Sequence, residues 1–82
     1  MTIEEIRELT AKGIERRIID ATPQAKRELQ FVHNGIKCRA ECGYNSDAHS
    51  CSYPDVAEAL ARILRKEGYT VKVEFSKIYI SW

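Results

Sequence analysis

The N-terminal part of the chain carries hydrophobic residues at helical spacing. Isoleucines recur there at intervals that bring them to one side of a helix, and they are Ile3, Ile6, Ile14 and Ile18. Acidic residues precede basic ones along the same stretch, which is the order that a helix macrodipole favours. The pattern predicts a helix from Thr2 to about Asp20.

Pro23 falls where this helical pattern continues. Proline is tolerated without distortion only in the first turn of a helix, so either a second helix begins at Pro23 or one long helix kinks there. Helical spacing resumes with Ala25, Leu29 and Val32. Asn34-Gly35 then supplies the left-handed residues that end helices. We therefore expect a helical region over residues 2–33, with a break or kink near residues 20–23.

In the following segment, hydrophobic residues recur at every second position instead of at helical spacing. Residues 36–42 alternate apolar and charged side chains, which predicts a half-buried strand whose Cys38 and Cys42 face the core. Residues 43–52 contain Gly, Asn, Asp and three Ser without a period. We expect a loop there that is longer than most connections.

A second helix and two further strands complete the pattern. Residues 54–67 place their apolar side chains on one face, after Ser52 as the helix cap. Residues 69–75 and 78–82 alternate as strands and are joined by a two-residue turn. The order of elements is therefore α-β-α-β-β.

This order predicts an α+β fold. We expect a single small domain over residues 1–82, made of the helical region and a sheet-helix unit over residues 36–82. The strand-helix-strand portion predicts a right-handed crossover between parallel strands, and the last two strands form an antiparallel pair. The expected sheet is a mixed three-stranded sheet with the helices packed on one face.

Composition and charge narrow the class of protein. The 82 residues are 44% hydrophobic and 30% charged, which fits one globular domain. The net charge of +1 provides no overall field to attract nucleic acid or an anionic membrane. No apolar run approaches the ~18 residues of a membrane span, and the acidic start does not resemble a signal peptide. We expect a cytoplasmic protein without nucleic-acid or membrane partners.

Three thiols and an imidazole form the most distinctive set of candidate ligands, and they are Cys38, Cys42, His49 and Cys51. Zinc prefers such donors in this number. On one extended strand, however, Cys38 and Cys42 would lie roughly 13 Å apart. Buried free thiols are therefore the favoured interpretation, with no cofactor. A zinc-stabilised nucleic-acid-binding module remains the alternative.

A cysteine nucleophile is a third interpretation. Cys51 and His49 lie near Asp47 in the sequence, which would supply a thiol, a base and an orienting carboxylate. Catalytic triads need convergence in space, and neighbours in sequence rarely converge. We therefore expect no enzyme, and keep a small cysteine-dependent enzyme as the third possibility.

The first helix points to association between chains. Its apolar row is longer than a three-stranded sheet covers, so Ile3, Ile6, Ile14 and Ile18 are the predicted interface of a homo-oligomer. Sequestration of a small ligand would need basic and aromatic side chains at a subunit interface. The candidates for this role are Arg16, Arg17, Tyr44, His49 and Tyr53.

Short motifs at both ends of the chain carry a resemblance. After Leu64, residues 68–71 (GYTV) lead from helix to strand; residues 78–82 read IYISW and residues 4–9 read EEIREL. In these features the chain resembles a loose group of small uncharacterised proteins of tailed bacteriophages and prophages. The resemblance implies expression in the cytoplasm of an infected bacterium and brings no catalytic residues with it.

These observations favour binding over catalysis. We expect a small non-catalytic binding protein, a phage-derived accessory factor that inhibits host defence. Its partner would be a host protein or a host signalling nucleotide that it sequesters.

Overall fold

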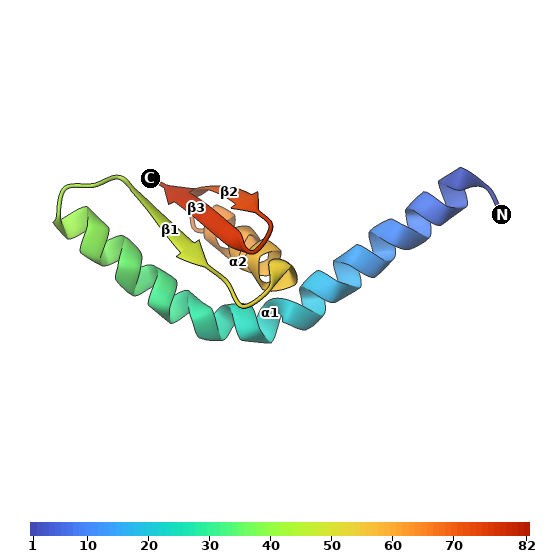
Figure 1. Ribbon diagram of the computed structural model, residues 1–82, viewed down its shortest axis with the longest axis horizontal. Helices are drawn as coiled ribbons and strands as arrows, with labels where there is room; N and C mark the ends of the chain where they lie inside the picture. Colours follow the sequence, from blue (N-terminus) through green and yellow to red (C-terminus); the bar gives the residue numbers. More distant parts are fainter.

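The computed structural model describes residues 1–82 and contains two helices and a three-stranded sheet (Figure 1). The elements are α1 (Ile3–Glu41), β1 (Ser46–Ser50), α2 (Pro54–Lys66), β2 (Thr70–Glu74) and β3 (Lys77–Ser81). The predicted α+β class and the order α-β-α-β-β are confirmed. Both helices pack on one face of the sheet, as expected, because buried and exposed residues alternate along β2 and β3.

Helix α1 is a single helix of 39 residues that continues through Pro23. The side chain of Thr2 caps it by accepting a hydrogen bond from the backbone N–H of Glu5. The helix bends in its middle (Figure 1), where Pro23 lacks a backbone donor and the Thr22 hydroxyl donates back to the Ile18 carbonyl. Of the two possibilities left open by the sequence, the kinked long helix is the observed one.

The predicted end of this helix at Asn34-Gly35 is wrong. Gly35 lies inside α1, and a Cβ at this position would stand 2.8 Å from Oδ2 of Asp47. The glycine therefore allows β1 to approach the helix closely instead of ending it.

The strand predicted over residues 36–42 is also wrong, because residues 36–41 form the last turns of α1 and Cys42 is its C-cap. Ile36 is buried four positions after Val32 and so continues the helical row. Cys38 and Cys42 were expected to face the core, but both are exposed. An alternation of apolar and charged residues over only seven positions does not distinguish the end of a helix from a strand.

The expected loop over residues 43–52 contains β1, which is the first strand of the sheet. Strand order is β1-β3-β2, and both pairs of neighbours are antiparallel. β1 and β2 run parallel to each other, but β3 lies between them. The predicted mixed sheet is therefore an antiparallel one, while the last two strands lie within about one residue of their expected bounds.

The core lies between the helices and the inner face of the sheet. From the sheet it contains Val71, Ile78 and Ile80, all at most 7% exposed. Helix α2 adds its fully buried side chains Val56, Leu60 and Leu64. Small residues, Ala21 and Ala25 on α1 and Ala57 and Ala61 on α2, are also buried, and they let the two helices pack closely.

Candidate binding surfaces

The first part of α1 projects beyond the rest of the molecule as an arm, which we define as residues 3–14 (Figure 1). The whole molecule is 55 Å long and only about 20 Å across. Helix α2 has 13 residues and each strand has five, so they cover only the later part of a 39-residue helix. The arm is therefore exposed at every position.

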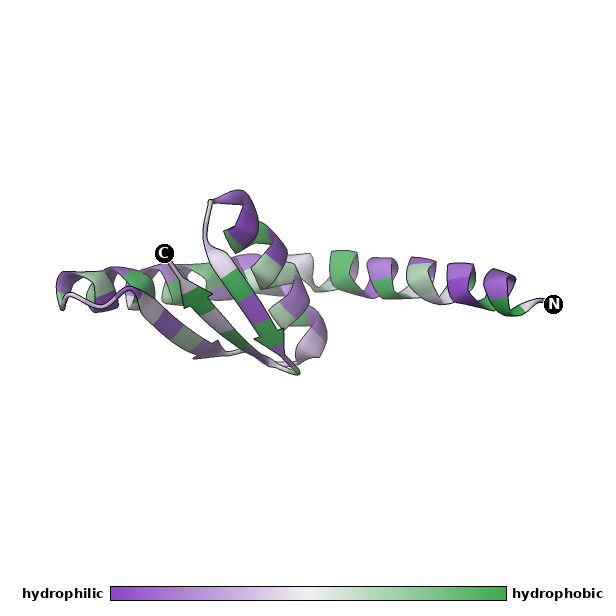
Figure 2. Ribbon diagram, turned by 90° about the horizontal axis from the view of Figure 1, so that it is seen from above, coloured by the Kyte–Doolittle hydropathy of each residue, from purple (hydrophilic) through white to green (hydrophobic).

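Apolar residues recur between polar ones along the arm (Figure 2), and helical spacing gathers them on one side. Its large side chains are Ile3, Ile6, Leu9 and Ile14, which are between 44% and 70% exposed. Ile18, the fourth residue of the predicted interface, is instead buried in the chain's own core. Three of the four predicted interface residues are therefore available to another molecule.

Two ion pairs hold α1 to α2 at the base of the arm. The Arg62 guanidinium donates two hydrogen bonds of 2.7 Å to the carboxylate of Glu15, and these bonds lower the pKa of Glu15. Arg17 donates a 3.1 Å hydrogen bond to Asp55. The bidentate pair fixes the point at which the arm leaves the body of the protein.

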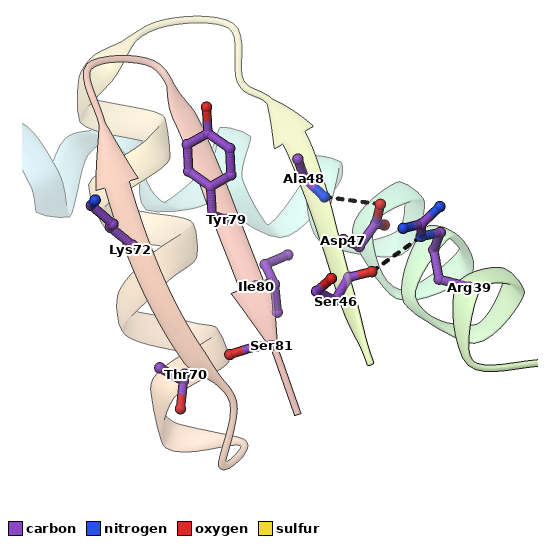
Figure 3. Close-up of a pocket in the computed structure, with 9 residues that line it drawn as sticks. All are labelled: Arg39, Ser46, Asp47, Ala48, Thr70, Lys72, Tyr79, Ile80 and Ser81. Atoms are coloured by element: carbon purple, nitrogen blue, oxygen red, sulfur yellow. Dashed lines mark hydrogen bonds between the residues drawn. The ribbon is translucent and has the colours of Figure 1, made fainter. Parts of the chain in front are cut away.

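The outer face of the sheet carries a hollow of about 330 Å³ (Figure 3). Tyr79 stands on β3 in the middle of this face, with Lys72 from β2 on one side and Arg39 from α1 on the other. The Arg39 guanidinium donates to the Ser46 carbonyl and lies 4.1 Å from the centre of the Tyr44 ring. Asp47 also lines the hollow, so its rim offers cationic, anionic and aromatic groups.

The predicted ligand-binding residues do not gather at one site. Arg16 lies on α1 near the arm, and Arg17 is bound to Asp55. Tyr44 stacks beneath Arg39, and Tyr53 is the residue before α2. No hollow of the molecule is lined by more than one of these side chains.

The predicted zinc set is not assembled, but two of its members meet a third residue. His49 and Cys51 lie beside Glu28 of α1, with one ligand atom of each within 4.8 Å of the others. Exposed Cys38 and Cys42 take no part in this cluster, and neither does Asp47, the expected orienting carboxylate. Sequence reasoning missed Glu28 because it lies on a distant helix and belongs to no motif.

Burial and charge control the protonation of this cluster. Burial raises the pKa of the Cys51 thiol to about 11, and the nearby Glu28 carboxylate adds to the effect. Burial also acts to raise the pKa of Glu28, but hydrogen bonds from Ser52 and Gln24 and the contact with His49 outweigh it and lower that pKa. A buried, protonated thiol is a poor nucleophile.

Comparison of the chain with protein families, with curated proteins and with solved structures gives no match. None of the helices combines the length and the apolar composition that a bilayer crossing requires.

Proposed function

We propose that the protein acts by binding and not by catalysis, as a homodimer in which the arms of two copies pack against each other. The observation that carries this proposal is the apolar face of the arm, whose large side chains remain 44% to 70% exposed in the single chain. A helical segment of about a dozen residues is only marginally stable alone in water. Packing against a second helix stabilises such a segment by burying its apolar face.

The charges of the arm favour a second copy as the occupant, in antiparallel orientation. Glu4, Glu5 and Glu8 outnumber Arg7 in its first two turns, whereas Lys12 lies toward its base and Arg16 follows just beyond it. Helical spacing places most of these charges away from Ile6 and Ile14, so antiparallel packing sets the acidic half of each arm alongside the basic half of the other without ion pairs across the apolar face. The same patch then serves both copies, as in a two-fold symmetric dimer.

Charges on the apolar face should dissociate this dimer. We expect sedimentation of the full chain to give twice the 9.4 kDa mass of one copy, and added salt to change the dimer only slightly, because the arm charges lie away from the apolar face. Ile6→Glu together with Ile14→Glu should raise the dissociation constant at least about 100-fold, because each buried isoleucine contributes roughly 1.5 to 3 kcal/mol.

Ile19→Glu is the matched control. Ile19 is 59% exposed on α1, but helical spacing places it on the side away from Ile6 and Ile14. This variant should leave the dimer intact. A monomeric wild-type chain, or equal dissociation by the control, would contradict the proposal.

The hollow on the outer sheet face favours a second activity, the binding of a nucleotide. Lys72 and Arg39 can contact an anionic phosphate, and the Tyr79 ring offers a stacking surface. Its volume lies at the small end of the range of ligand sites. The resemblance to phage proteins makes a host signalling nucleotide the ligand class that we assign to it.

Calorimetric titration with linear and cyclic nucleotides tests this second activity. We expect binding by the wild-type chain and an affinity at least about tenfold lower for Tyr79→Ala, because stacking of a base contributes about 1 to 3 kcal/mol. Phe75→Ala is the matched control, since Phe75 is an exposed aromatic residue outside the hollow. Flat titrations with the wild-type chain would remove nucleotide sequestration as a function.

A further inference from the structure

Three ligand-bearing side chains from separate segments converge on the inner side of β1. Glu28 comes from α1, His49 from β1, and Cys51 from the residue that follows this strand. Cys51 is 8% exposed, and the side chains of His49 and Glu28 are 24% and 13% exposed. The cluster lies where β1 runs alongside α1 (Figure 1).

The imidazole of His49 lacks a hydrogen-bond partner at a buried atom. Its Nε2 is enclosed by protein and makes no hydrogen bond. The nearest carboxylate oxygen is Oε1 of Glu28, at 3.5 Å, which is longer than an N–H···O hydrogen bond. Buried polar atoms are nearly always satisfied in folded proteins, so this nitrogen faces a position that a cation can fill.

The carboxylate of Glu28 is already oriented toward the same position. Its Oε2 accepts hydrogen bonds from the Ser52 hydroxyl at 2.8 Å and from the Gln24 amide at 3.1 Å. Its other oxygen, Oε1, is the one that faces His49. Outer hydrogen bonds of this kind fix metal-binding carboxylates and raise their affinity.

We propose that Glu28, His49 and Cys51 bind one Zn²⁺ ion, with water as the fourth ligand. One sulfur, one nitrogen and one oxygen donor suit this borderline metal better than the hard Mg²⁺ or Ca²⁺. Tetrahedral zinc would hold these donors about 3.3 to 3.8 Å apart, so the cluster, now within 4.8 Å, needs only a small contraction. The ion would connect the middle of α1 to the segment between β1 and α2.

Cobalt is the probe for this site, since Co²⁺ occupies zinc sites and absorbs light when a thiolate binds it. The full chain with Cys38→Ser and Cys42→Ser keeps Cys51 as its only thiol. After treatment with a chelator, we expect this chain to bind one Co²⁺ with a thiolate-to-cobalt absorption band. Zn²⁺ should displace the cobalt and raise the melting temperature, and binding should release a proton from the thiol.

Two variants and one control locate the site. His49→Ala should weaken cobalt binding at least about 100-fold, and Ser52→Ala should weaken it about tenfold by freeing the Glu28 carboxylate. His33→Ala is the control, because His33 is bound to Glu67 outside the cluster and should leave affinity unchanged. If His49→Ala does not fold, the site is tested by the cobalt affinity of Ser52→Ala and by the rise in melting temperature that Zn²⁺ causes in the unsubstituted chain.

Two results would overturn the proposal. The first is a cobalt band in the unsubstituted chain that is absent from the chain with Cys38→Ser and Cys42→Ser. This result would place the metal on the exposed thiols at the end of α1. The other is a band that is insensitive to both His49→Ala and Ser52→Ala.

Discussion

Leu60→Ala should cost about 2 to 5 kcal/mol of the free energy of unfolding. Leu60 is fully buried in the middle of α2, the helix that contacts α1, β2 and β3. A chain of this length has a total stability of roughly 4 to 12 kcal/mol. The variant should therefore lie close to the limit at which the domain still folds at room temperature.

Urea denaturation measures this loss, with Lys66→Ala as the control. Lys66 lies on the same helix but is exposed, so its substitution should change the free energy of unfolding by less than about 0.5 kcal/mol. Similar midpoints for the two variants would show that α2 does not form the centre of the core.

Much of the fold could be predicted because long hydrophobic patterns are hard to misread. The apolar stripe of α2 and the alternation of the last two strands gave elements close to those observed. The spacing of Ile3, Ile6 and Ile14 likewise predicted residues that the body of the protein leaves exposed.

The errors occurred where local pattern and tertiary context disagree. Strand β1 reads Ser-Asp-Ala-His-Ser and has no large apolar residue, so nothing in its composition indicates a strand. The strand forms because it pairs with β3, where Asp47 and His49 lie opposite Ile80 and Ile78. Because this polar strand has no hydrophobic pattern, residues 36–42 are the only segment before α2 whose alternation resembles a strand.

The candidate metal site could be predicted only in part for the same reason. His49 and Cys51 lie two residues apart, and the sequence suggested both as ligands. Their partner Glu28 is more than 20 residues away on a helix whose kink and length were left open. Only the packing of α1 along β1 brings this carboxylate to the other two donors.

The metal-free protein should lose stability as the solution becomes alkaline, and Cys51 should account for a measurable part of that loss. Folding raises the pKa of this thiol from 9.0 to about 11, so the folded state retains a proton that the unfolded state releases. The stabilisation is fully present below pH 9 and disappears as the pH rises to about 11. The slope approaches about 1.4 kcal/mol per pH unit, and the whole loss is about 2 to 3 kcal/mol.

Denaturation at several pH values between 8 and 11.5, with a chelator and a reducing agent present, measures this effect. Other groups also titrate in this range, so the informative quantity is the difference in slope between the wild-type chain and Cys51→Ala, which should have the shallower dependence. Equal slopes would contradict the argument. A chain loaded with Zn²⁺ should also lose the contribution of Cys51, because a metal-bound thiol has already given up its proton.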